Sequence, residues 1–284
     1  MAADAAILST RLAQRPGLVA TGVFDALSAV LAERAGFEAL FLSGSALALT
    51  QLARPDVGLL TLTELADSVA RISQRVQVPL LVDADHGFGN AINVSRAVQV
   101  LERAGASGIQ LEDRVEAALP ADLGRRPVVG TEIMLGKLRA ALDARRSPTT
   151  IISARTDAFY SAGLDDALER AERFIETGAD MVFVEGCVSD QDRRRVVAQL
   201  SARAPVLFNT SILPPEQLPP CAELAALGYA VILFPAVAVA AAGAAMQESL
   251  AGLQAWTKGA GFTPAAFDAG ASIGSGPFMK KFTG

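Results

Sequence analysis

Short apolar runs alternate with longer amphipathic stretches along nearly the whole chain. The runs are rich in valine, isoleucine, leucine and phenylalanine, and most end at polar residues or glycine. Because they are apolar almost throughout, they predict strands that are covered on both faces, as in a parallel sheet. The expected strands span residues 18–22, 38–44, 78–85, 107–113, 149–157, 180–186, 204–209 and 229–234.

The stretches between these runs have the spacing of helices. Apolar residues recur at i, i+3, i+4 and i+7, with charges on the opposite face, in residues 25–36, 63–76, 92–105 and 165–179. Eight strands alternating with helices predict an α/β protein, a (β/α)8 TIM barrel that forms a single domain over residues 1–284. A doubly wound open sheet is the alternative, but "TGVFDAL" after the first strand lacks the glycine-rich turn of a dinucleotide site.

The segment "YAVILFPAVAVAAAGAAM", residues 229–246, approaches the length of a membrane span. Alanine dominates it and Pro235 interrupts it, which disfavours a transmembrane helix. We expect a buried strand, a break at the proline and an alanine-rich packing helix. A C-terminal helical tail should therefore begin at about residue 236.

Composition narrows the classes of function. Half the residues (51%) are apolar, the net charge is −5, and no basic run is present, so neither nucleic acid nor a membrane is the expected partner. The N-terminus carries an early acid and no long apolar core of a signal peptide. Cys187 and Cys221 form no disulfide framework and suit a reducing compartment. We expect a cytoplasmic protein.

Polar residues gather where the expected strands end. In a barrel of parallel strands these ends meet at one rim, where active sites lie. Alternation along a strand would point the side chains of Asp83 and Asp85 the same way, and two such charges need a cation between them or a proton on one. A functional site is therefore expected at the rim formed by Ser43, Gly44, Ser45, Asp83, Asp85, Glu112, Asp113, Arg155, Asp157, Glu185 and Asn209.

Oxygen ligands without a histidine or cysteine cluster suit a hard cation, Mg²⁺ or alternatively Mn²⁺. Asp85 and Glu112 are the expected direct ligands, and Asp83 acts through water or orients its neighbours. Arg155 is suited to grip a carboxylate through two hydrogen bonds, although it could instead neutralise the acids. His86, the single histidine, is a candidate acid or base, or alternatively a loop anchor.

Five blocks of sequence together resemble the isocitrate lyase/phosphoenolpyruvate mutase superfamily. They are "GVFDALSAVLAERAGFEALFLSG", "PDVGLLTLTE", "LVDADHGFGNAINVSRAVQVLERAGASGIQLED", "KLRAALDARR" and "IISARTDAF", and the resemblance runs from about residue 16 to 235. It implies a TIM barrel, Mg²⁺ and a 2-oxo or 2-hydroxy carboxylate that reacts through an enolate-like species. It also implies a homotetramer or homodimer in which the C-terminal helix is exchanged between subunits.

The resemblance also implies roles for particular residues. Ser43, Gly44 and Ser45 would bind the substrate carboxylate together with Arg155, and Asp56 would stand at the edge of a metal site. Asp83, Asp85 and Glu112 would form the rest of that metal site. Glu185 and Asn209 match polar, substrate-binding positions after the sixth and seventh strands.

One departure bears on the reaction. Lyases of the superfamily carry a cysteine-containing motif after the fourth strand as the proton donor, whereas residues 114–130 contain no cysteine, histidine or lysine. The loop around Arg125 and Arg126 is still expected to close over the site. The block "DADHGFGNAINV" is most similar to the oxaloacetate decarboxylase branch, which also lacks the cysteine, although that branch has a histidine near the last strand that is absent here.

These features favour a Mg²⁺-dependent carbon–carbon lyase acting on a 2-oxo or 2-hydroxy dicarboxylate, most simply an oxaloacetate decarboxylase. Phosphorus–carbon bond chemistry, as in phosphoenolpyruvate mutase, is one alternative. Retro-aldol cleavage of a methylisocitrate or dimethylmalate is another. A non-catalytic dicarboxylate-binding protein is the third.

Overall fold

Eight parallel strands close into a barrel in which each strand pairs with its neighbours in the sequence and β8 pairs with β1. The computed structural model describes residues 5–14, 17–115, 126–259 and 261. The predicted TIM barrel is confirmed, and each expected strand is present; β1 is one residue longer than expected, and the other seven strands are shorter. The strands are β1 Leu18–Val23, β2 Ala39–Leu42, β3 Leu80–Asp83, β4 Gly108–Glu112, β5 Ile151–Thr156, β6 Met181–Val184, β7 Val206–Asn209 and β8 Val231–Phe234.

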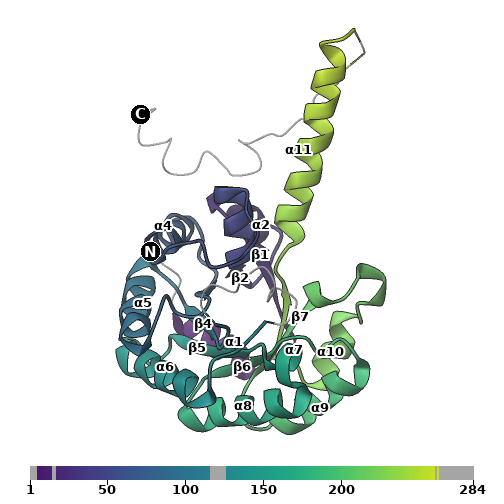
Figure 1. The fold of residues 1–284 in the computed structure, drawn as a ribbon. Helices are drawn as coiled ribbons and strands as arrows, with labels where there is room; N and C mark the ends of the chain where they lie inside the picture. Colours follow the sequence, from purple (N-terminus) through teal and green to yellow (C-terminus); the bar gives the residue numbers. More distant parts are fainter. Residues whose placement is uncertain (1–4, 15–16, 116–125, 260, 262–284) are drawn as a thin grey trace.

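Helices surround the barrel (Figure 1). The four helices expected from apolar spacing are confirmed as α2, α4, α5 and α8, and side-chain caps fix the starts of the first three. The helices are α1 Ala5–Gln14, α2 Ala26–Arg34, α3 Gly44–Leu47, α4 Leu62–Ser73, α5 Ala91–Ala104, α6 Thr131–Ala144, α7 Ala158–Ala162, α8 Leu164–Thr177, α9 Asp190–Leu200, α10 Cys221–Leu227 and α11 Val237–Trp256. Short helical turns of other types cover η1 Ala48–Leu52, η3 Thr210–Ile212 and η4 Pro215–Gln217.

Two apolar cores account for the alternation along the strands. One fills the layer between strands and helices, and the other fills the barrel interior with side chains such as Phe41, Phe183 and Leu233. Leu8 of α1 is 3% exposed and belongs to the interior core. The N-terminal helix therefore closes the amino end of the barrel, and polar chemistry is confined to the other end.

The C-terminal helix α11 projects away from the barrel (Figure 1). None of its 20 residues is buried within the described parts of the chain, and Met246, Leu250 and Trp256 are exposed. The break at Pro235 is as expected, but α11 makes little of the expected packing against its own barrel. No helix among the described residues has the length and apolar character needed to cross a membrane.

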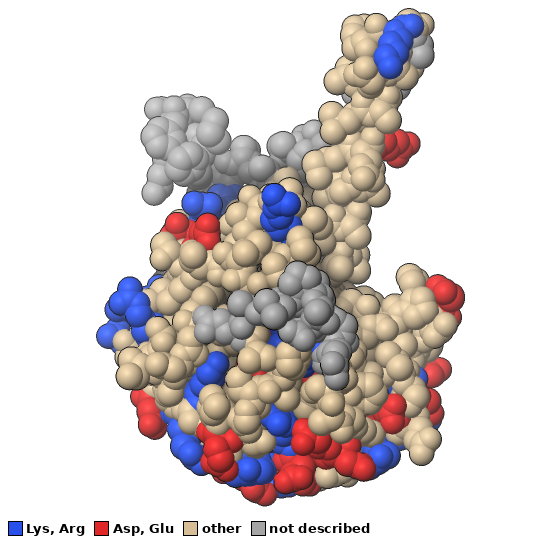
Figure 2. All heavy atoms as spheres, viewed as in Figure 1, with Lys and Arg blue, Asp and Glu red and all other residues tan. Residues whose placement is uncertain are grey.

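Acidic and basic side chains intermingle on the face in Figure 2, mainly around the lower part of the barrel. The upper part of the barrel and α11 carry few charges on this face. This face thus presents no continuous basic patch of the kind that binds nucleic acid.

Candidate active site

A cavity of about 210 Å³ opens at the carboxyl end of the barrel strands, directly above the interior core. Its walls combine arginines, acids and hydroxyls with a few apolar side chains, so it suits a small polar ligand. The lining residues are Phe41, Ser43, Ser45, Asp56, Asp83, Gln110, Arg114, Arg126, Arg155, Phe183, Glu185, Asn209, Ser211, Leu233 and Pro235.

The paired aspartates lie together with the Ser43–Ser45 turn. A Cβ atom added at Gly44 would be 3.2 Å from Asp85 Oδ1 and 3.5 Å from Asp83 Oδ2, so the glycine allows a close approach. The backbone N–H groups of Gly44 and Asp85 partly offset the rise that burial causes in the pKa of Asp83. Ser43 caps α3, and its Oγ is 3.0 Å from Ser45 Oγ.

Asp85 is placed in this cluster by a backbone turn, which the alternation of side chains along a strand did not predict. Strand β3 ends at Asp83, and Asp85 has a left-handed backbone with φ of 48°. Its carbonyl still accepts a hydrogen bond from the N–H of Glu112 at 2.9 Å, which extends the β3–β4 pairing past the strand end. The turn at Asp85, not the pleat of a strand, therefore brings Asp85 to Glu112.

The acids of this cluster repel one another. Burial, together with the neighbouring carboxylates, raises the pKa of Asp85 well above its ordinary value. Burial also raises the pKa of Asp83, and it raises that of Glu112 to about 8, with Arg155 offsetting part of each effect. Such a set is stabilised by a cation, because a cation favours the charged carboxylates that burial disfavours.

The donor chemistry fits Mg²⁺. Asp56, Asp83, Asp85 and Glu112 offer only oxygen atoms, the donors that hard cations prefer. Within the described residues, no three acidic, histidine or cysteine side chains already converge on one point as a preformed metal cage. Mg²⁺ commonly takes one or two carboxylates directly and keeps waters and substrate oxygens as its other ligands.

Arg155 is held rigidly at the cavity wall. Its Nη1 lies 3.2 Å from Glu112 Oε2, and its Nε and Nη2 lie 2.9 and 3.0 Å from the two oxygens of Asp157. Burial lowers the pKa of Arg155, but Asp157 and Glu112 more than offset this, so the guanidinium stays charged. Arg155 thus both neutralises buried acids and offers a positive wall to the cavity.

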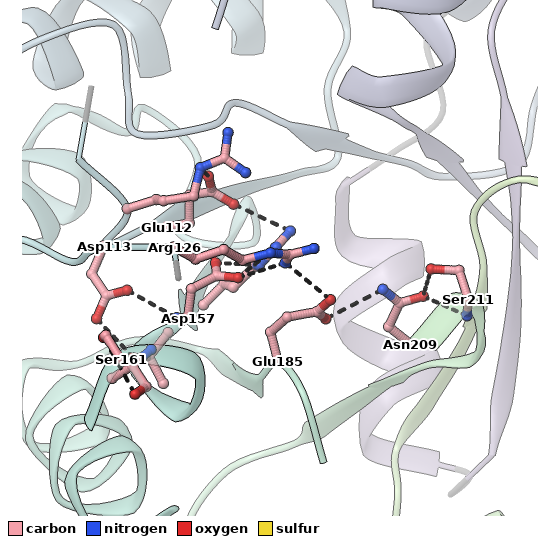
Figure 3. Close-up of polar contacts among 12 residues, drawn as sticks. Glu112, Asp113, Arg126, Asp157, Ser161, Glu185, Asn209 and Ser211 are labelled. Atoms are coloured by element: carbon pink, nitrogen blue, oxygen red, sulfur yellow. Dashed lines mark hydrogen bonds and ion pairs between the residues drawn. The ribbon is translucent and has the colours of Figure 1, made fainter. Parts of the chain in front are cut away.

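A second arginine reaches the same carboxylate from the segment after β4. Figure 3 shows Arg126 extending between Asp157 and Glu185, with its Nη1 2.8 Å from Asp157 Oδ1 and 3.3 Å from Glu185 Oε1. Asn209 Nδ2 donates to Glu185 Oε2 at 3.2 Å. Arg126 lines the cavity, and Arg125 lies outside the described residues, so closure of this loop over the site stays a prediction.

His86 is buried but is not among the described residues that line the cavity. The same is true of three other candidates from the sequence, Gly44, Asp85 and Glu112. The backbone carbonyl of His86 accepts a hydrogen bond from Lys137 Nζ at 2.8 Å, so this segment is tied to α6. Because this bond involves only the backbone of His86, both roles expected for its ring, acid–base catalysis and loop anchoring, stay predictions.

Three polar residues of the cavity wall, Gln110, Arg114 and Ser211, were not predicted from the sequence. Gln110 is fully buried in β4, and its Nε2 is 3.4 Å from Asp83 Oδ1. Arg114 follows β4, with its Nε 3.3 Å from Glu112 Oε1. Gln110 could have been found from the sequence, because it is an amide side chain inside an otherwise apolar strand. Arg114 could have been found only from its proximity to Glu112 in the sequence.

Residues 8–254 match the family model described as phosphoenolpyruvate phosphomutase. The chain belongs to this family. Enzymes of the isocitrate lyase/phosphoenolpyruvate mutase superfamily are therefore its relatives, and the predicted superfamily is confirmed.

Several relatives of this family member carry lyase names. The chain is 42% identical to a 2-methylisocitrate lyase of Aeropyrum pernix (81% of this chain and 73% of that protein) and 37% identical to the 2,3-dimethylmalate lyase of Eubacterium barkeri (86% and 84%). It is 38% identical to an oxaloacetate decarboxylase of Bradyrhizobium diazoefficiens (84% and 81%). A phosphonopyruvate hydrolase solved with oxalate and Mg²⁺ superimposes with a TM-score of 0.85 at 26% identity (98% and 97%).

Proposed function

We propose that this family member is a Mg²⁺-dependent carbon–carbon lyase acting on a small 2-oxo or 2-hydroxy dicarboxylate, most simply an oxaloacetate decarboxylase. The observation that carries the proposal is the cavity wall itself, where buried carboxylates short of positive charge stand beside Arg155 and the Ser43–Ser45 turn. A cation site next to an anion-binding wall matches an acid that chelates a metal and is gripped by an arginine.

The roles of the residues follow from their contacts. Asp85 and Glu112 would hold the cation, Asp83 and Asp56 would complete its surroundings through water, and Arg155 would hold the substrate carboxylate. Bound there, Mg²⁺ supplies Lewis-acid stabilisation of the negative charge that develops on the substrate.

Ser43, Ser45 and the Gly44 N–H group would orient the same carboxylate as Arg155. Glu185 and Asn209 would contact the far end of the acid, where Arg126 partly neutralises Glu185. With the substrate fixed at both ends, the bond to be broken is held in one orientation, which lowers the entropic cost of reaction.

Oxaloacetate is the simplest substrate because the cavity of about 210 Å³ is small and the relatives include an oxaloacetate decarboxylase. Loss of CO2 from this acid leaves an enolate, whose charge the site would stabilise. The relatives also include lyases of 2-methylisocitrate and 2,3-dimethylmalate, so retro-aldol cleavage of a 2-hydroxy acid is the second candidate.

Removal of the metal should stop the reaction. A proton NMR time course with oxaloacetate, 2-methylisocitrate, 2,3-dimethylmalate and phosphonopyruvate, run with Mg²⁺ and then with EDTA, should give pyruvate from oxaloacetate only with Mg²⁺ and above the metal-only background. EDTA should reduce turnover at least about 100-fold, because Lewis-acid stabilisation is worth several kcal/mol. Cleavage of a hydroxy acid with oxaloacetate untouched would favour the second candidate, and turnover that resists EDTA would contradict the metal assignment.

We propose further that α11 is covered by another copy of the chain, in a homodimer or homotetramer. Its exposed apolar residues, including Leu250, Leu253 and Trp256, would otherwise remain in water.

Leu253→Glu is therefore expected to lower the mass measured by size-exclusion chromatography with light scattering, since burying an unpaired charge costs several kcal/mol. Gln254→Glu, which adds the same charge on the same helix, is the control. An unchanged assembly in Leu253→Glu would contradict this arrangement.

A further inference from the structure

Asp113 directly follows Glu112 but does not face the cavity. It is fully buried, and its backbone ties two segments together: its N–H donates to the carbonyl of Arg155 at 3.2 Å, and its carbonyl accepts from the N–H of Val129 at 2.8 Å. Asp113 therefore joins the end of β4 to the end of β5 and to the chain that follows Arg126.

The carboxylate of Asp113 makes three further contacts. It accepts hydrogen bonds from Thr156 Oγ1 at 2.7 Å, from the backbone N–H of Asp157 at 3.0 Å and from Arg170 Nη1 at 3.3 Å. Figure 3 shows the Asp113 carboxylate beside the chain at Asp157. Asp113 thus holds the backbone of Asp157, the residue whose carboxylate contacts both Arg155 and Arg126.

Arg170 completes the connection from the outer layer. It comes from α8, and its side chain is 12% exposed. Its Nη1 also donates to the carbonyl of Val129 at 2.8 Å, and its Nε donates to Asp166 Oδ1 at 2.6 Å. Both backbone polar groups of Val129 are therefore held, one by Asp113 and the other by Arg170.

We propose that Asp113 and Arg170 are positioning residues, which set the places of Arg155 and Arg126 at the cavity wall by way of Asp157 and Val129. The expected effect on substrate binding and turnover rests on the proposed function. The positioning of the two arginines rests only on the contacts described above. A buried carboxylate costs free energy unless its hydrogen-bonding capacity is used, and Asp113 contacts Thr156, Asp157 and Arg170, which lie next to or bind the segments that carry those two arginines. Small displacements of such groups cost reaction rate steeply.

The test replaces Arg170 by glutamine, with Arg173→Gln as the matched control. Arg173 lies on the same helix, is more exposed and pairs with Glu132 at the surface. Hydrogen exchange followed by mass spectrometry should give faster exchange in peptides covering residues 126–130 and 155–158 of Arg170→Gln, because the N–H groups of Val129 and Asp157 lose their anchored acceptor. Arg173→Gln should exchange there like the unaltered protein.

Function is tested in the same two variants by calorimetry of Mg²⁺-dependent oxalate binding and by kcat/KM for the substrate found by NMR. Arg170→Gln should weaken both about 10-fold to 100-fold, with a melting temperature close to that of the control. In a double-mutant cycle, Arg126→Met should cost less in the Arg170→Gln background than in the unaltered protein, because both act on the same group. A role confined to stability would lower the melting temperature and leave the two effects additive.

The exchange and activity measurements distinguish failure of the positioning role from failure of the proposed function. Unchanged exchange at residues 126–130 and 155–158 in Arg170→Gln overturns the positioning role, whatever the enzyme's reaction. Faster exchange there in a protein that binds no oxalate with Mg²⁺ and cleaves no acid supports the positioning of the arginines and overturns the proposed function instead. Faster exchange with additive effects on kcat/KM overturns the link to the substrate.

Discussion

Replacing Asp85 by alanine is expected to abolish Mg²⁺-dependent turnover while the barrel remains folded. Asp85 is 8% exposed and has a left-handed backbone, and the neighbouring acids Asp83 and Asp56 add to burial in raising its pKa. If a cation sits among these carboxylates, loss of one direct ligand removes most of the charge stabilisation, which is worth several kcal/mol and hence at least about 1,000-fold in rate.

The same substitution should change the stability of the metal-free protein little, because two effects oppose each other: alanine is disfavoured in the left-handed backbone at this position, and repulsion among the acids is relieved. Removing one of several buried like charges relieves repulsion that the unliganded protein otherwise carries. The measurement is the melting temperature with and without Mg²⁺: the unaltered protein should gain stability from the ion, because the ion binds the folded state, and Asp85→Ala should not. Asp67→Ala, at an exposed position of α4, is the control. Full activity or an intact Mg²⁺ effect in Asp85→Ala would refute the assignment.

Replacing Arg155 by methionine is expected to cost both activity and stability. Arg155 faces two buried acids, and among the described residues its removal leaves Glu112 with Arg114 alone and Asp157 with Arg126 alone. Removing one partner of a buried ion pair destabilises proteins by about 3–5 kcal/mol. Loss of the group that grips the substrate carboxylate should raise KM as well as lower kcat.

The stability loss in Arg155→Met should depend on pH, and its sign can be worked out. Burial raises the pKa of Asp157, but Arg155 and Arg126 more than offset this, so the folded-state pKa is lowered. In the unaltered protein this group therefore contributes stability that is present above the unfolded pKa and lost as pH falls through the folded pKa. Without Arg155 the pKa of Asp157 in the folded state should rise. Ionisation of Asp157 should then stabilise the folded variant less than it stabilises the unaltered protein, or should destabilise it.

Urea unfolding at pH 5 and pH 8 tests this. The difference in unfolding free energy between Arg155→Met and the unaltered protein should be larger at pH 8, because ionisation of Asp157 stabilises the unaltered protein more than the variant. Arg173→Met, which removes a more exposed arginine of α8, should show little difference at either pH. A loss of stability that is equal at both pH values would mean that Arg155 acts mainly through packing.

The position of the site could be predicted from two local properties of the sequence, the spacing of apolar runs and the polar residues that end them. Apolar runs spaced by amphipathic helices specify a parallel barrel, and the residues that end those runs must meet at one rim. Ser43, Asp83, Glu185 and Asn209 were found in this way, and all four line the cavity. The resemblance to the superfamily added Asp56, which no periodicity could single out and which also lines the cavity.

The contacts between site residues that lie behind the cavity wall could not be predicted in the same way. Sequence reasoning grouped Asp113 and Asp157 with the other rim acids, but neither lines the cavity among the described residues, and both hold other groups in place. Which way a residue faces after a strand has ended depends on the turn that follows, and the pleat no longer sets it. Asp85 illustrates this, because its left-handed turn brings it back to Glu112.

By itself the sequence determined the fold, the rim and the oxygen-rich character of the site, because hydrophobic periodicity and the chemistry of side chains are local properties. Only the tertiary structure decided that Arg126 and Arg155 share one carboxylate, that Arg170 reaches the back of the site from α8, and that α11 leaves its own barrel. These contacts join residues from separate turns of the barrel, and their geometry arises only when strand closure and helix packing bring those segments together.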